Sequence, residues 1–295
     1  MRPLVSVIIP THNRANLLRR AINSALSQDY NNIEIIVVDD HSTDETEKVM
    51  QGILQCCPSV RYLRLTDNYG ANAARNLGIR ATKGHFICGL DDDDEFHPER
   101  IRRLVAEYDE AYAFVFSGYR DIMEDKITIR IPAKEAFSLD DILGLNLVGN
   151  QVLTTRQKIL AVGGYDESLP AAQDYDLWIR LLERYGKAAC VRLPLYSVYY
   201  HSGETISKSP KKTKGYFAVY KKHKHMMKRA HRKQQLANLY LARQKTLSLK
   251  TFFALFTLGM ANPLTSWFLK NKVPVIYALL RGTKHAIRDL FFGRP

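Results

Sequence analysis

The 295-residue chain has only four cysteines, and their arrangement excludes the common cysteine-based scaffolds. They lack the spacing of a zinc site, and two of them are adjacent, which makes a poor disulfide framework. The four are Cys56, Cys57, Cys88 and Cys190. The sequence therefore predicts a reducing, cytosolic compartment. Residues 1–10 do not predict a signal peptide, because the apolar stretch 4–9 is short and ends at Pro10.

Long apolar runs are scarce as well. Residues 251–269 carry no charge and just reach the length of a membrane span. Gly259, Asn262 and Pro263 interrupt them, however. The segment therefore predicts two amphipathic or buried helices joined at residues 261–263, and a membrane-inserted span is the alternative.

Glycine-rich phosphate-binding motifs are missing. Neither GxGxxG nor a P-loop occurs, which argues against dinucleotide oxidoreductases and P-loop kinases. A nucleotidyltransferase, another enzyme with acids and a metal on an α/β sheet, would normally carry a glycine-rich loop with a lysine or arginine near its first strand. The PTHN segment at residues 10–13 is not such a loop. A nucleotidyltransferase is therefore kept only as an alternative.

Acidic residues are almost absent from residues 211–295. That segment has 19 lysine and arginine residues against a single acid, Asp289, whereas residues 1–210 have 24 against 29. The net charge of +13 thus combines a mildly acidic body with a strongly basic tail. This asymmetry indicates an anionic partner, either a membrane surface or a nucleic acid.

Short apolar runs alternate with helical patterns over the first 90 residues. The expected strands are residues 4–9, 33–38, 60–65 and 85–90, and the expected helices are residues 14–28, 44–54 and 71–81. Continuously apolar strands separated by helices predict a parallel sheet covered on both faces, so the fold class is α/β. After residue 98 the expected strands are 111–117, 126–131 and 188–200, and the expected helices are 138–143 and 174–184.

The acidic run LDDDDE at residues 90–95 is the strongest chemical signal. It follows the fourth expected strand, and ligands of open α/β sheets bind at the carboxyl ends of strands. Four successive carboxylates repel one another, which favours a cation as partner. Mg²⁺ and Mn²⁺ prefer such oxygen ligands and bridge them to phosphates. The alternative is a solvated acidic turn before a helix that starts near Pro98.

A second acidic segment, VVDDHSTD at residues 37–44, follows the second expected strand. Asp39 comes directly after the strand, where a carboxylate can accept hydrogen bonds from a base or a ribose. Thr43 and Asp44 are expected to cap the next helix instead.

Five regions, in the same order, resemble family 2 glycosyltransferases. They are VSVIIPTHNR (5–14), EIIVVDDHSTD (34–44), GANAARNLG (70–78), LDDDDE (90–95), and GGYDE (163–167) followed by QDYDLW (173–178). Two positions depart from the family pattern. His41 replaces the usual glycine after the paired acids, and we expect a mild effect. Gln173 replaces the usual glutamate before the expected base, and we expect altered acceptor contacts.

The resemblance implies a GT-A fold, which is a Rossmann-like, mostly parallel sheet flanked by helices, followed here by a basic helical C-terminal tail. It also implies a nucleotide-diphosphate sugar donor, expected to be a UDP-sugar, and inversion at the anomeric carbon. By position, the nucleotide-sugar site would contain Pro10, Thr11, Asn13, Asp39, Arg75, Asp91 and Asp92. Asp93 and Asp91 would hold Mg²⁺ or Mn²⁺, and Asp174 would be the catalytic base.

Five further basic side chains are candidates with less specific roles. His201 would ligate the metal or contact the diphosphate, and a structural role is the alternative. Arg14 is an available cation. The other three, Arg100, Arg102 and Arg103, are expected to lie on a solvated helix face.

We expect a catalytic domain at residues 1–210, with a nucleotide-sugar half at 1–97 and an acceptor half at 98–210. Residues 211–295 would form a basic helical extension whose lysines, arginines and interleaved aromatics suit an anionic membrane surface. The alternatives are a solvated helical face and a non-catalytic nucleic-acid-binding role. No recognisable nucleic-acid-binding motif is present, so no nucleic acid partner is expected.

The QxxRW motif and multiple spans of processive synthases are absent from the sequence, so transfer of a single sugar is expected. The expected acceptor is a hydroxyl of a glycan or a lipid-linked compound in the synthesis of a cell-surface polysaccharide or lipopolysaccharide. The expected location is cytoplasmic and peripheral, on the inner face of the cytoplasmic membrane.

Overall fold

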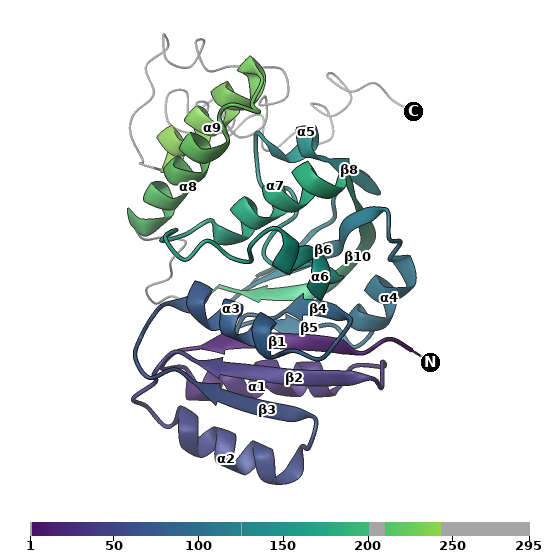
Figure 1. Cartoon of the computed structure of the whole chain (residues 1–295), viewed down its shortest axis with the longest axis vertical. Helices are drawn as coiled ribbons and strands as arrows, with labels where there is room; N and C mark the ends of the chain where they lie inside the picture. The colour runs from purple at the N-terminus through teal and green to yellow at the C-terminus, as the bar shows by residue number, and fades with distance from the viewer. Residues whose placement is uncertain (1, 125, 201–209, 243–295) are drawn as a thin grey trace. The chain divides into compact units, whose positions relative to one another are not determined.

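The computed structural model describes residues 2–124, 126–200 and 210–242 (Figure 1). The strands are β1 (Val5–Thr11), β2 (Ile33–Asp39), β3 (Val60–Arg64), β4 (Phe86–Gly89), β5 (Glu95–Phe96), β6 (Tyr112–Met123), β7 (Lys126–Arg130), β8 (Ala136–Ser138), β9 (Leu153–Thr155) and β10 (Lys187–Tyr199). The helices are α1 (Ala15–Leu26), α2 (Thr46–Cys56), α3 (Ala71–Ala81), α4 (Arg100–Glu107), α5 (Leu139–Ile142), α6 (Arg156–Ala161), α7 (Gln173–Tyr185), α8 (Pro210–His223) and α9 (Arg229–Ala242). The predicted α/β class is confirmed.

The strands of the described residues form one mixed sheet in the order β3-β2-β1-β4-β9-β6-β10-β5, with β7 beside β6 and β8 beside β10. β1 pairs in parallel with β2 and β4, and β6 pairs in parallel with β10. β9 is antiparallel to both β4 and β6, so β6 and β10 run in the same direction as β4. The carboxyl ends of β1, β2, β4, β6 and β10 therefore lie at one edge of the sheet, where the candidate side chains are expected to meet.

Helices cover both faces of the first half of this sheet. Ile35 and Val37 of β2 belong to the same core cluster as Ile22 of α1. Their neighbours Ile36 and Val38 pack in a second cluster with α3. Successive residues of a strand point to opposite faces, so a strand covered on both sides is apolar at nearly every position. This explains why the sequence shows continuous apolar runs here.

Several elements of the second half differ from the sequence prediction. β6 extends to Met123, beyond the predicted end at residue 117, and its later part contains the polar residues Arg120 and Asp121. β5 and β9 have only two and three residues, and neither was predicted. Strands of this length are too short to show a periodic pattern.

The chain separates into two compact units, Met1–Val219 and Tyr220–Pro295. The first unit includes α8 as far as Val219, whereas the sequence analysis divides the chain near residue 210. The predicted domains and half-domains stay predictions. None of the helices in the described ranges is long and apolar enough to cross a bilayer. Residues 251–269 and His201 lie outside the described residues.

Candidate active site

The loops that follow β1 and β2 are joined through Asn13. Thr11 lies opposite Asp39 in the parallel register, so the two loops begin side by side. The Asn13 side-chain oxygen accepts a hydrogen bond from the Thr43 N–H at 2.7 Å, and the Asn13 N–H donates to Ser42 Oγ at 2.9 Å. Asn13 thus shapes both loops, and its contact with a nucleotide stays a prediction.

Two adjacent carboxylates fix the loops after β2 and β3. Asp39 is fully buried. Its Oδ1 accepts hydrogen bonds from the Ser42 N–H at 2.8 Å and the Ser42 hydroxyl at 2.5 Å, and its Oδ2 accepts one from the Tyr62 hydroxyl at 2.6 Å. Asp40, to which the sequence analysis gave no role, accepts two hydrogen bonds at 2.8 Å from the N–H groups that precede α3. In this arrangement Asp39 organises its own loop, and its contact with a base or ribose stays a prediction.

The next residue, His41, has a φ of 63°. Glycine adopts this left-handed conformation freely, whereas a residue with a side chain adopts it at a cost of roughly 1–2 kcal/mol. His41 therefore stands in a backbone conformation that a glycine would adopt without strain.

Arg14 holds the middle of the acidic run. Its Nη1 donates to Asp92 at 3.0 Å and to Asp93 at 2.6 Å. Asp92 also accepts a hydrogen bond from the Thr11 hydroxyl at 2.7 Å. Burial raises the pKa of Asp92 to about 6, although Arg14 and Thr11 act to lower it. Burial and the neighbouring Asp91 likewise raise the pKa of Asp93. Pro10 precedes this group as a buried residue of β1.

Asp91 is oriented by two partners from distant segments. Its Oδ1 accepts hydrogen bonds from Arg75 Nη2 of α3 and from Gln151 Nε2 before β9, both at 2.9 Å. Gln151 fits there because residue 89 is a glycine: an added Cβ would lie 1.9 Å from Gln151 Oε1. Both hydrogen bonds go to the same oxygen and fix the direction of the carboxylate.

Asp94 connects the acidic run to β10. Its N–H donates to the Asp91 carbonyl at 3.1 Å, and its Oδ1 accepts from the Tyr199 N–H of β10 at 3.0 Å. Burial, together with the charges of Asp91 and Asp93, raises the pKa of Asp94 well above its ordinary value. The hydroxyl of Tyr196 accepts a hydrogen bond from the Asp91 N–H at 3.2 Å.

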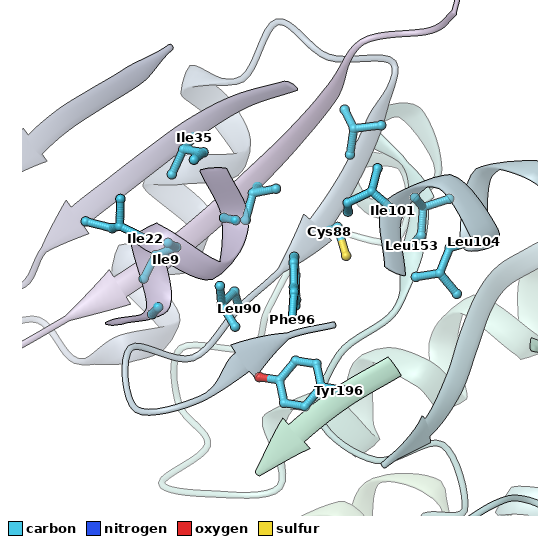
Figure 2. Close-up of a cluster of buried hydrophobic side chains, with 14 of the residues drawn as sticks. Ile9, Ile22, Ile35, Cys88, Leu90, Phe96, Ile101, Leu104, Leu153 and Tyr196 are labelled. Carbon is cyan, nitrogen blue, oxygen red and sulfur yellow. The ribbon is translucent and has the colours of Figure 1, made fainter. Parts of the chain in front are cut away.

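The prediction that Arg100 lies on a solvated helix face is wrong. Arg100 is fully buried, donates to the Ser117 hydroxyl at 2.7 Å and to the Gln151 carbonyl at 3.1 Å, and lies over two aromatic rings. The ring centroids of Phe96 and Tyr196 are 5.0 and 4.9 Å from its guanidinium carbon. Figure 2 shows these two rings side by side in the core, near Leu90 where the acidic run begins. α4 turns Arg100 inward because its buried face also contains Ile101 and Leu104. Arg102 and Arg103 lie at the surface of α4, paired with Glu99.

Asp174 lies in the first turn of α7. Ala172, the residue just before α7, has a left-handed φ of 60°, an uncommon conformation that recurs at functional sites. The side chain of Asp174 is half-buried, but its Oδ1 is shielded from solvent and has no hydrogen-bond partner within the described residues. Burial raises the pKa of Asp174 to about 7, with Arg75 acting to lower it and Asp91 to raise it. The structure thus brings Asp174, Arg75 and Asp91 within electrostatic reach of one another.

The chemistry of the acidic run fits a divalent cation. Asp91 and Asp93 supply only oxygen atoms, and each pairs with an arginine through a single nitrogen, Arg75 with Asp91 and Arg14 with Asp93. Within the part of the chain that the structure describes, no three His, Cys, Asp or Glu side chains converge as a complete metal cage. Mg²⁺ is commonly held by one or two carboxylates together with substrate phosphates, so two aspartates suffice.

Gln151 and Tyr165 are among the residues of this site that were missed from the sequence. Gln151 has no local signal, because its role depends on β9 lying beside β4. Tyr165 lies in the GGYDE segment; its ring centroid is 5.5 Å from the Arg75 guanidinium carbon, and burial and the Asp174 charge raise its pKa. Only the second of these lies in a segment that the sequence analysis singled out.

Comparison with known proteins matches two family models to the chain. Glycosyl transferase family 2 matches residues 6–157, and glycosyltransferase like family 2 matches residues 114–208. A putative colanic acid biosynthesis glycosyl transferase, WcaA of Escherichia coli, is 35% identical over 263 residues, which are 86% of this chain and 94% of that protein. A GalNAc(5)-diNAcBac-PP-undecaprenol beta-1,3-glucosyltransferase of Campylobacter jejuni is 29% identical over 214 residues, covering 70% of this chain and 69% of the other.

Solved structures share the fold. TarS of S. aureus in complex with UDP-GlcNAc has a TM-score of 0.67 and 20% identity, over 90% of this chain and 79% of that one. A mannosyltransferase of Pyrobaculum calidifontis in complex with GDP-Man and Mn²⁺ has a TM-score of 0.63 and 18% identity, over 99% and 82% of the two chains. At these identities the likeness concerns the fold, and it agrees with the GT-A fold expected from the sequence.

Proposed function

Because the chain belongs to glycosyl transferase family 2, it is a glycosyltransferase, and we propose that it moves a single sugar from a nucleotide-diphosphate sugar to an acceptor hydroxyl with inversion at the anomeric carbon. The donor is a UDP-sugar, and the acceptor is a hydroxyl of a glycan or lipid-linked compound of the cell envelope. The names of the Escherichia coli and Campylobacter jejuni relatives support an envelope acceptor.

The observation that carries this proposal is the convergence of Asp91, Arg75 and Asp174. Asp91 follows β4, and Asp174 lies in the first turn of α7. The guanidinium of Arg75 pairs with Asp91 at 2.9 Å, and its charge acts to lower the pKa of Asp174. An oriented carboxylate within the acidic run and a second one with a raised pKa are two carboxyl groups in different environments. Such pairs commonly divide ligand binding and proton transfer between them.

Asp93 and Asp91 would hold a Mg²⁺ or Mn²⁺ ion, with His201 as a further candidate ligand. When bound, such an ion offsets the negative charge that develops on a departing diphosphate. Arg14 and Arg75 bring positive charge to the same carboxylates. Pro10, Thr11, Asn13, Asp39 and Asp92 stay our candidates for the nucleotide side of the site.

Asp174 is the proposed general base. Its carboxylate takes the proton of the acceptor hydroxyl while the acceptor oxygen bonds to the anomeric carbon, and the bond from that carbon to the diphosphate oxygen breaks. The nucleoside diphosphate leaves with the bonding electrons. A positioned base of this kind typically contributes ~10²–10⁴-fold to the rate. A raised pKa makes Asp174 a stronger base than an ordinary carboxylate, provided that it is deprotonated.

The basic C-terminal extension is proposed to bind an anionic membrane surface from the cytoplasmic side, at ~1 kcal/mol per cation near the surface. Lys211, Lys214, Lys221 and Lys222 are exposed residues of α8. Membrane binding would bring the enzyme to a lipid-linked acceptor. A nucleotidyltransferase and a non-catalytic nucleic-acid-binding protein are not favoured by the family membership.

The test is release of nucleotide from a panel of UDP-, GDP- and dTDP-sugars with Mn²⁺ or Mg²⁺. Asp93→Ala and Asp174→Ala are each expected to abolish transfer, while Glu45→Ala, a solvent-exposed carboxylate at the start of α2, is expected to leave it unchanged. A wild-type rate in either aspartate variant would remove that residue from the mechanism. A protein that turns over no donor, with or without metal, would overturn the proposal.

A further inference from the structure

The first helix of the basic extension lies against the segment that leads into α7. Gly215 of α8 is buried, and a Cβ added there would lie 2.3 Å from the carbonyl oxygen of Ala171. Real side chains do not approach a carbonyl so closely, so only glycine allows α8 to pack this near the backbone. The contact is within the first compact unit, which extends to Val219. This part of α8 is therefore packed beside the residues that precede Asp174.

Tyr216 follows Gly215 and lies at the same contact. Its ring centroid is 6.1 Å from that of Tyr175, with an angle of 38° between the ring planes. Burial raises the pKa of the Tyr216 phenol, and the Asp174 carboxylate raises it further. The phenol therefore lies within electrostatic reach of the candidate base, on a helix that the sequence analysis assigned only to membrane binding.

We propose that Tyr216 forms a wall of the acceptor subsite and orients the acceptor sugar so that its hydroxyl faces Asp174. This inference rests on the proposed function. A phenol has an apolar face, which suits the hydrocarbon face of a sugar ring, and a hydroxyl that can bond to a sugar oxygen. The carboxylate of Asp174, half-buried at the start of α7, would receive the proton of the acceptor hydroxyl.

Tyr216 is a positioning residue in this scheme, because the proton goes to Asp174. Its second effect is to keep water away from the base, since an aromatic wall beside a half-buried carboxylate limits access. Removing the wall should therefore harm transfer to a sugar and favour transfer to water. A purely structural role would not change this partition.

The experiment compares the full-length wild-type protein with Tyr216→Phe and Tyr216→Ala. The matched control is Thr213→Ala, which also removes a hydroxyl from α8. Two rates are measured with the active donor: transfer to p-nitrophenyl glycosides of glucose, galactose and N-acetylglucosamine, and hydrolysis of the donor without acceptor. Binding of UDP by calorimetry reports whether the donor side of each variant is intact.

For Tyr216→Ala we expect the acceptor KM to rise about tenfold, the effect of one lost hydrogen bond and ring contact. Donor hydrolysis should rise severalfold, and UDP affinity should stay within about twofold. Tyr216→Phe should raise the acceptor KM less and leave hydrolysis unchanged, because the ring is kept.

Wild-type acceptor KM and hydrolysis in Tyr216→Ala, with the protein folded, would overturn this inference alone. If a glycoside is not accepted by the wild-type protein, an unchanged hydrolysis rate in Tyr216→Ala still overturns it. An inert wild-type protein would instead overturn the proposed function, and this inference with it.

Discussion

Replacement of Asp174 by asparagine is expected to slow catalysis by ~10²–10⁴-fold and to stabilise the protein at the same time. The side chain keeps its shape but loses its charge. As general base, Asp174 acts only when deprotonated, and burial raises its pKa to about 7. The rate of wild-type transfer should therefore rise with pH, by about tenfold between pH 6 and pH 8, as the deprotonated fraction grows from roughly 0.1 to roughly 0.9.

The raised pKa of Asp174 also predicts how the free energy of unfolding changes with pH. A carboxyl whose pKa rises on folding, from an ordinary 3.8 to about 7, favours the folded protein when protonated. The wild-type protein therefore loses stability as pH rises from about 4 to about 7, and the asparagine variant does not. One pKa unit corresponds to about 1.4 kcal/mol, so the upper limit is about 4 kcal/mol. Because the side chain is only half-buried, we expect a gain on the order of 1–3 kcal/mol at pH 8.

Two measurements test this prediction. Initial rates of nucleotide release between pH 5.5 and 9 should fall by ~10²–10⁴-fold in Asp174→Asn, and the residual rate should lose its dependence on pH near 7. Urea unfolding at pH 5 and pH 8 should show a gain in stability that is larger at pH 8. Glu183→Gln, which removes an exposed carboxylate from the same helix, is the control for both. The reasoning is refuted if the rate of Asp174→Asn still rises with pH as that of the wild type does, or if the variant is less stable than the wild type at pH 8.

Three further variants probe the fold and the supports of the site. Hydrogen bonds hold the pKa of Glu34 below its ordinary value despite burial, so the stabilisation by this carboxylate is lost as pH falls through that lowered pKa. In urea unfolding, Glu34→Gln should therefore lower the free energy of unfolding by about 1–3 kcal/mol at pH 7 and by less at pH 3. Gln151→Leu should weaken Mn²⁺ binding, followed by electron paramagnetic resonance, by ~10–100-fold, because Asp91 loses an orienting partner. Arg100→Met should lower the free energy of unfolding by about 2–4 kcal/mol, whereas Arg103→Met on the exposed side of α4 should change it by less than about 0.5 kcal/mol.

Much of the first half of the sheet could be predicted from sequence because β1 and β2 are buried on both faces. Residues 33–38 were expected as a strand, and β2 spans Ile33–Asp39. The same runs located the carboxyl ends of the strands, and hence the place where Asp39 and Asp91 leave the sheet. A parallel register then brings Thr11 beside Asp39 without further information.

The partners of the acidic side chains could not be predicted in this way. Gln151 reaches Asp91 from a segment 60 residues away and lies in no pattern that specifies the contact, whereas Arg75 lies in the GANAARNLG segment that the sequence analysis placed in the same site. Arg100 was assigned to the surface because a charged residue beside other charged residues normally faces water. The burial of Arg100 depends on Ser117 of β6, Phe96 of β5 and Tyr196 of β10. Contacts across a sheet leave no local periodicity.

The balance of charge in the acidic run connects the fold with the proposed chemistry. Asp91, Asp92 and Asp93 meet Arg14 and Arg75, while Arg20 pairs with Glu95 and donates to the Asp93 carbonyl. The five carboxylates of residues 91–95 thus face three arginines, and burial together with the neighbouring carboxylates leaves Asp92, Asp93 and Asp94 with raised pKa values. A fold that held these residues only for stability would gain by replacing some of them with neutral side chains. The excess negative charge is thus best explained by a cationic ligand, and an ion carrying two charges would balance it.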